Sequence, residues 1–173
     1  MKYLKQYCIP VKELKQEVYN FDFYVNDKFF EQFENSEIKK GNADVKITLK
    51  KNSQNIILEF DINGSVNVMC DRCLDYFDLP IKINEKLFFV FSNEHKSSSH
   101  DFIILNLNEN EINVAQYIYE FIILNLPIKK IHPNDEFGNN ACNKEMLEKL
   151  NSYTQKKETE IDPRWNKLKS LIK

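Results

Sequence analysis

The chain has 173 residues, of which 42% are hydrophobic and 29% charged, and its 24 basic and 26 acidic side chains leave a net charge of −2. This length and composition fit one soluble globular domain with a small appendage. They exclude fibrous and membrane-spanning proteins, because no apolar run approaches the roughly 20 residues that a bilayer requires. The N-terminus is too polar for a signal peptide, so we expect a cytoplasmic protein.

Apolar and polar residues alternate through about the first 90 positions, a pattern that predicts half-buried β-strands. The predicted strands are 18–25, 43–50, 56–62, 65–69 and 77–91, the last of them interrupted by Pro80. The short polar loop 52–55 predicts an antiparallel hairpin between the second and third strands. A second hairpin is expected around Cys70 and Cys73, and residues 28–33 favour a short helical turn between the first two strands.

The pattern changes to helical after a polar loop at 92–100 and a short predicted strand within 101–107. Apolar residues recur at three and four positions from 113 to 126, where Pro127 ends the predicted helix. A second, shorter helix is predicted at 143–150. Strands followed by helices indicate an α+β fold, with an antiparallel sheet or partly open β-barrel in the N-terminal half and helices in the C-terminal half.

The C-terminal residues 152–173 are predicted to be a polar linker and a basic amphipathic helix, separate from a single α+β domain at 1–151. Asp162 is suited to cap this last helix, and Pro163 to occupy its first turn. Four of its residues are candidates for RNA contact: Arg164, Trp165, Lys167 and Lys169. The competing interpretation is a helix that docks its apolar side chains on the protein and keeps its lysines in water.

The four cysteines are expected to be thiols or metal ligands, because disulfides are rare in a reducing compartment. Cys70 and Cys73 are spaced to present both sulfurs to one tetrahedral metal ion. His132 and Cys142 follow in a later loop and would complete a Cys3His set for zinc. The alternative is that the cysteines are reduced thiols, with Cys142 and Cys8 as small buried hydrophobic residues. A redox-active pair is disfavoured, since such motifs open a helix in a βαβ unit.

No constellation in the sequence supports an enzyme. His95 and His100 flank a serine-rich loop, but nothing brings a nucleophile, a base and an orienting acid together. The nearly neutral charge also gives no global nucleic-acid signal. Any RNA contact must therefore come from a local patch, and Arg72 at the turn between the cysteines is one candidate for it.

Several segments of the chain follow one another in a recognisable order. They are 66–74 with Phe77 after it, 111–113 and 121–127, then 127–132 followed by Cys142, and 162–165 followed by Leu168 and Leu171. Together they resemble the large ribosomal RNA subunit accumulation protein family, also called the YceD family. Many members carry a second CxxC in the later loop, where this chain has His132 and Cys142.

The resemblance implies a cytoplasmic, non-enzymatic factor that promotes accumulation of large-subunit (23S) ribosomal RNA and assembly of the large ribosomal subunit. The implied partners are ribosomal RNA, a large-subunit ribosomal protein or an assembly intermediate, with no membrane and no small-molecule substrate. An alternative is a protein-interaction module that chaperones a basic ribosomal protein without touching RNA, which the net charge of −2 also suits.

Overall fold

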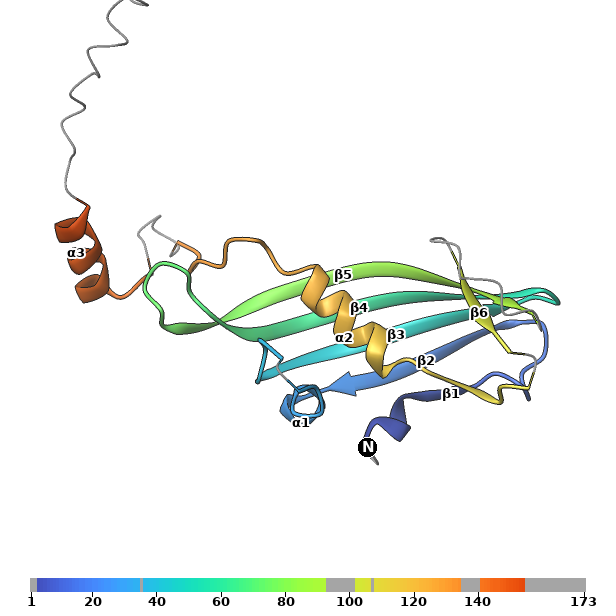
Figure 1. The fold of residues 1–173 in the computed structure, drawn as a ribbon. Coiled ribbons are helices and arrows are strands. Elements are labelled where there is room, and N and C mark those ends of the chain that lie inside the picture. The colour runs from blue at the N-terminus through green and yellow to red at the C-terminus, as the bar shows by residue number, and fades with distance from the viewer. Residues whose placement is uncertain (1–2, 35, 93–101, 107, 135–140, 155–173) are drawn as a thin grey trace, which may run out of the picture. The chain divides into compact units, whose positions relative to one another are not determined.

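The computed structural model describes residues 3–34, 36–92, 102–106, 108–134 and 141–154. The chain divides into two compact units, Met1–Ile131 and His132–Lys173. The first unit is built on a five-stranded sheet that is crossed by a helix, as Figure 1 shows. The predicted α+β class is therefore confirmed, with the sheet in the N-terminal region and helices later in the chain.

The sheet has the strand order β2-β3-β4-β5-β6, so β2 and β6 form its two ends. The strands are β2 (Val18–Val25), β3 (Gly41–Lys51), β4 (Asn55–Met69), β5 (Tyr76–Phe91) and β6 (Ile103–Leu105). The first four pair antiparallel, which confirms both predicted hairpins, whereas β6 pairs parallel to the end of β5.

Strand β4 corrects the prediction of two separate strands at 56–62 and 65–69, because the chain passes through Gly64 without a turn. Gly64 lies opposite Ala43 of β3, and a Cβ atom placed on it would lie 2.1 Å from the carbonyl oxygen of Asn42. The glycine is thus required for the close approach of two strands. The interruption predicted at Pro80 is also absent, because β5 continues through this residue. Strand β6 pairs only with residues 89–91, so among the described residues no strand pairs with β5 at Pro80 on the side away from β4. Proline is tolerated at such a free edge.

A two-stranded sheet accompanies the main one and was not predicted. Strand β1 (Cys8–Pro10) follows the 3-10 helix η1 (Tyr3–Tyr7) and pairs antiparallel with β7 (Glu111–Asn113). The predicted helix at 113–126 therefore begins later, as α2 (Ala115–Leu124), since the residues before it belong to a strand. The short helical turn predicted at 28–33 corresponds to α1 (Asp27–Phe30).

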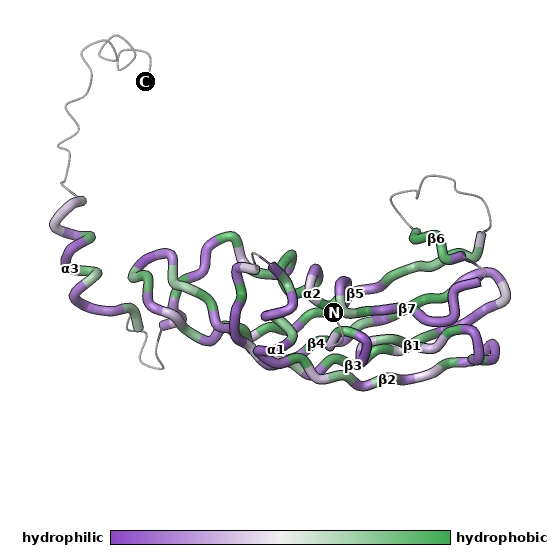
Figure 2. The backbone as a smooth tube through the Cα atoms, turned by 60° about the horizontal axis from the view of Figure 1, so that its bottom comes forward, coloured by the Kyte–Doolittle hydropathy of each residue, from purple (hydrophilic) through white to green (hydrophobic). Residues whose placement is uncertain are grey.

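One face of the main sheet forms the hydrophobic core. Figure 2 shows hydrophobic and hydrophilic residues alternating along the strands, and the apolar set on β3 and β4 is fully buried. Helix α2 lies on this face, where the ring of Phe121 is 5.1 Å from that of Phe60 and the ring of Tyr117 is 5.9 Å from that of Phe89. This packing leaves the polar side chains on the opposite face of the sheet.

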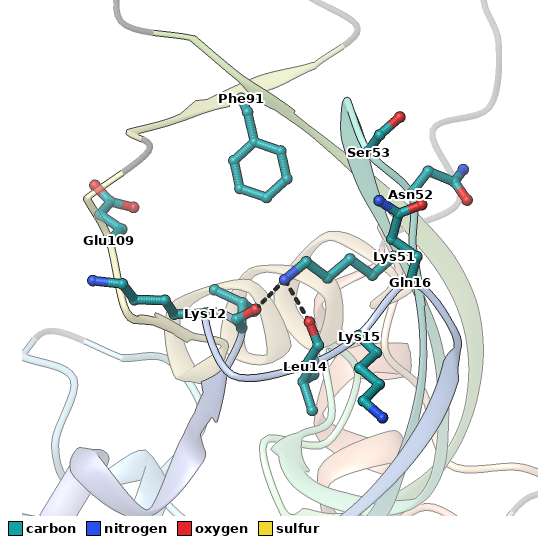
Figure 3. A pocket seen from close by; sticks show the side chains of 10 residues that line it. Lys12, Leu14, Lys15, Gln16, Lys51, Asn52, Ser53, Phe91 and Glu109 are labelled. Atoms are coloured by element: carbon teal, nitrogen blue, oxygen red, sulfur yellow. Dashed lines mark hydrogen bonds between the residues drawn. The ribbon is translucent and has the colours of Figure 1, made fainter.

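Lys51 at the end of β3 secures the loop between β1 and β2. Its Nζ donates to the carbonyl oxygens of Val11 at 2.6 Å and Leu14 at 2.8 Å, beside a hollow of about 520 Å³. Figure 3 shows Lys12 and Lys15 extending in different directions from this loop. Because the lysines do not converge, we assign no ligand to this hollow.

The second unit contains α3 (Lys144–Tyr153), which confirms the helix predicted at 143–150. Asn143 caps it, since its side-chain oxygen accepts from the backbone N–H of Glu145 at 3.1 Å and of Met146 at 3.4 Å. The predicted C-terminal helix at 162–173 lies outside the described residues. In the part of the chain that the structure describes, no helix has the length and apolar character needed to span a membrane.

Candidate metal centre

The turn between β4 and β5 carries both cysteines of the CxxC motif on a compact backbone. The N–H of Leu74 donates to the carbonyl oxygen of Cys70 at 2.9 Å, and the N–H of Cys70 donates to that of Asp75 at 2.9 Å. Leu74 adopts a φ of 64°, a left-handed conformation that closes the turn directly after Cys73. Both cysteines are buried, so two sulfur atoms are held out of water within one turn.

The segment after α2 is attached to this same turn, within the first unit. The N–H of Asp71 donates to the carbonyl oxygen of Lys130 at 2.7 Å, and the N–H of Lys130 donates to Asp71 Oδ2 at 2.6 Å. The Lys130 ammonium also pairs with Glu37. These contacts join the turn to a segment far along the chain, and nothing in the local sequence pattern announces them.

The second unit holds the other two candidate ligands close together. Cys142 Sγ lies 3.7 Å from His132 Nδ1, and Cys142 is buried. Cys142 directly precedes Asn143, so the capped start of α3 fixes the backbone on one side of this cysteine. A histidine nitrogen and a cysteine sulfur at this separation suit two ligands of one metal ion.

Each of Cys70, Cys73, His132 and Cys142 offers one ligand atom, and these four atoms all lie within 4.8 Å of one another. The ligands of a tetrahedral zinc ion lie about 2.0–2.3 Å from the metal and hence about 3.3–3.8 Å apart. The observed group is therefore close enough to hold a metal ion after a small contraction. Three sulfurs and one imidazole form a donor set that zinc favours, so the residues fit this metal.

Cys8 is not part of this group. It lies in β1, where burial and then the neighbouring Glu111 carboxylate raise the pKa of its thiol. A raised pKa keeps the thiol protonated at neutral pH. Cys8 is only half-buried, because the three-residue strand β1 leaves part of its side chain exposed, and this corrects its interpretation as a small buried hydrophobic residue.

The candidate RNA-contact residues divide into two groups. Arg72 is half-buried in the turn between the two cysteines. The other four, Arg164, Trp165, Lys167 and Lys169, lie outside the described residues, as do His95 and His100. RNA contact by any of these residues stays a prediction.

Comparison with known proteins shows which family the chain belongs to. The model of the family described as "Large ribosomal RNA subunit accumulation protein YceD" matches residues 58–172, which is more than half of the chain. The chain is also similar to the protein described as "Uncharacterized protein YlbN" from Bacillus subtilis (strain 168), with 26% identity over 134 residues that cover 78% of this chain and 73% of that protein. No solved structure matches. The turn that carries Cys70 and Cys73, together with His132 and Cys142, lies inside the matched range, and the chain belongs to the large ribosomal RNA subunit accumulation protein (YceD) family.

Proposed function

We propose that this protein is a non-enzymatic factor that promotes accumulation of large-subunit ribosomal RNA and assembly of the large ribosomal subunit. The observation that carries the proposal is the family match, which spans both the cysteine turn and the C-terminal basic segment. A direct contact with ribosomal RNA is the form of this function that we favour, and the cytoplasmic location stays a prediction.

We also propose that zinc is the metal of the Cys3His group. Four protein ligands fill a tetrahedral zinc sphere and leave no position for water or substrate, which is typical of structural sites. Zinc bound in this way would stabilise the turn that presents Arg72. This role agrees with a binding protein rather than a metalloenzyme.

The test of the assembly role follows a tagged full-length protein through a sucrose gradient of cell extract. The proposal expects the protein to sediment with immature particles that contain large-subunit RNA. Sedimentation only as free protein, under conditions that preserve these particles, would contradict it.

A second experiment separates RNA contact from the alternative of a chaperone for a basic ribosomal protein, which the chain's net charge of −2 supports. The full-length protein is recovered from extract with and without nuclease. Partners held through RNA are lost after nuclease treatment, whereas a ribosomal protein bound directly is retained. Direct retention of one ribosomal protein, with no RNA bound by the purified chain, would favour the chaperone.

A further inference from the structure

The end of the β4–β5 hairpin exposes large side chains that the fold does not bury. Tyr76 at the start of β5 is 67% exposed, and its partner across the strands, Met69, is 46% exposed. Directly paired residues share a face of the sheet, and here it is the face opposite the core. The positions along this face of β4 and β5 are mostly polar, and the exposed ring of Tyr76 is not part of the buried core.

Tyr76 lines a hollow of about 340 Å³ together with Glu37, Lys39, Lys40 and Asn67. The segment before β3 continues along β4 at this point, because the N–H of Asn67 donates to the carbonyl oxygen of Lys40 at 2.9 Å. This hydrogen bond holds the backbone of Lys40 alongside β4, next to the hollow that both lysines and Tyr76 line. The volume lies at the low end of the range of about 300–1,000 Å³ found for ligand pockets.

The charges around the hollow are unevenly neutralised. Glu37, the acidic residue that lines the hollow, forms an ion pair with Lys130, so its negative charge is offset. The exposed side chains of Lys39 and Lys40, in contrast, form no hydrogen bond or ion pair with any described residue. Among the residues that line the hollow, Lys39 and Lys40 therefore keep positive charges that the fold leaves available, although the whole chain carries a net charge of −2.

We propose that this surface, formed by Lys39, Lys40, Asn67 and Tyr76 and here called the hairpin-end surface, binds an unpaired strand of RNA. A base stacks on the exposed ring of Tyr76, and Lys39 and Lys40 contact neighbouring phosphates. Duplex RNA does not fit this use, because its bases are already stacked on one another.

Asn67 adds a fixed polar group to the same hollow. Its Nδ2 donates to Asp78 Oδ1 at 2.8 Å across the two strands. This bond orients the amide and leaves Oδ1 of Asn67 as an acceptor for an amino group on the edge of a base. The surface thus combines a stacking platform, an oriented acceptor and two cations.

Charge favours RNA over a protein as the occupant. The strongly basic proteins of ribosomes would be repelled by Lys39 and Lys40, whereas a phosphate backbone is attracted to them. The inference rests on the proposed function, since it names the contact through which the protein would meet ribosomal RNA.

The test measures binding of a fluorescently labelled, short, mixed-sequence single-stranded RNA to the purified full-length protein by anisotropy. Loss of one stacking contact in Tyr76→Ala should weaken binding by about 5- to 150-fold, while Tyr76→Phe should retain it. Phe88→Ala is the matched control, because Phe88 is an exposed aromatic residue on the same face of β5 near the other end of the strand.

The lysines are tested through salt dependence. The double variant Lys39→Gln, Lys40→Gln should reduce the slope of log affinity against log salt by about 1.4, which corresponds to two phosphate contacts on a single strand. The matched double variant Lys12→Gln, Lys15→Gln removes two exposed lysines from the loop between β1 and β2 and should leave the slope unchanged.

The outcomes separate this inference from the proposed function. If the wild-type protein binds the RNA but Tyr76→Ala and the Lys39, Lys40 variant bind it equally well, the hairpin-end surface is not the RNA site and only the inference is overturned. If the wild-type protein binds no RNA and still sediments with immature large subunits, RNA contact itself is wrong and the chaperone alternative gains. If Tyr76→Ala keeps RNA binding and loses a ribosomal protein in the nuclease-treated pull-down, the surface is a protein site.

Discussion

Asp71 and Lys130 exchange two hydrogen bonds although 59 positions separate them. Asp71 donates its backbone N–H to the carbonyl oxygen of Lys130 at 2.7 Å, and the Lys130 N–H donates to Asp71 Oδ2 at 2.6 Å. The pair attaches the segment after α2 to the turn that holds Cys70 and Cys73. It therefore positions the chain two residues before His132, the third candidate ligand.

Replacing Asp71 with alanine should destabilise the protein and weaken metal binding together. The change removes the carboxylate acceptor of the Lys130 N–H, and one such bond at an exposed site contributes about 1 kcal/mol to the free energy of unfolding. Urea unfolding and a zinc competition titration measure the two effects. The control is Asp44→Ala, because Asp44 is exposed on β3 and forms no side-chain hydrogen bond or ion pair with a described residue. Equal losses in both variants would show that the Asp71 contact is unimportant.

Replacing Cys73 with serine should abolish zinc binding while changing the side-chain volume little. We expect about one zinc ion per chain in the wild-type protein and a small fraction of that in Cys73→Ser, measured by mass spectrometry of the metal content. A chelator should lower the melting temperature of the wild-type protein but not that of Cys73→Ser. At a free zinc concentration of about 100 times the dissociation constant, the metal stabilises the fold by about 2.7 kcal/mol.

Cys8→Ser is the matched control for this experiment, since Cys8 lies in β1 and is not one of the four grouped ligands. This variant should keep its zinc. Wild-type protein that is purified without chelators and contains no metal would contradict the zinc assignment.

Replacing Gly64 with alanine should destabilise the sheet strongly. Its Cβ would lie 2.1 Å from the carbonyl oxygen of Asn42 and 2.6 Å from the Cα of Ala43, and backbone atoms of a central strand pair move only at a cost. We expect a loss of about 2–4 kcal/mol in the free energy of unfolding. Gly41→Ala should cost less, because its closest neighbours lie at 3.0 Å and one of them is a ring atom of Phe30. Equal stability of Gly64→Ala and the wild-type protein would contradict the strand register.

The carboxylate of Glu59, on the outer face of the sheet, makes the stability of the fold depend on pH. Hydrogen bonds from Lys50, and then from Lys86, lower the pKa of Glu59 from 4.5 to about 2. A lowered pKa in the folded protein means that the stabilisation is present above pH 4.5 and is lost as the pH falls through about 2. Glu59→Gln should therefore be less stable than the wild-type protein above this window and similar to it below.

Urea midpoints for both proteins across the window measure this difference. High salt should reduce the difference, because the three charges are at the surface. A difference between the two proteins that does not change with pH would show that the ion pairs contribute nothing to stability.

Much of the sheet could be predicted from the period-two pattern alone. Strand β2 has the predicted bounds, because its eight residues alternate without interruption. The three-residue strands β1 and β7 are too short for a pattern to stand out, and they exist only because they pair with each other. The sequence pattern predicts a break between 62 and 65, because the close approach of Gly64 to Ala43 appears only in the paired sheet.

The metal group was predictable in part. The spacing of Cys70 and Cys73 indicates two ligands in a turn, whereas the positions of His132 and Cys142 depend on long-range contacts. The exchange of hydrogen bonds between Asp71 and Lys130 has no local signal. Tyr76 has a signal in the sequence, because it directly precedes the predicted strand 77–91 at a position where the alternation calls for a polar residue.

The central claim is a role in the large ribosomal subunit, and the most direct measurement is the ratio of large- to small-subunit ribosomal RNA in cells depleted of this protein. The account predicts a selective loss of large-subunit RNA and of the large-subunit peak in the sedimentation profile. It also predicts that the wild-type chain restores both and that Cys73→Ser restores them poorly. An unchanged ratio in fully depleted cells would contradict the proposed function.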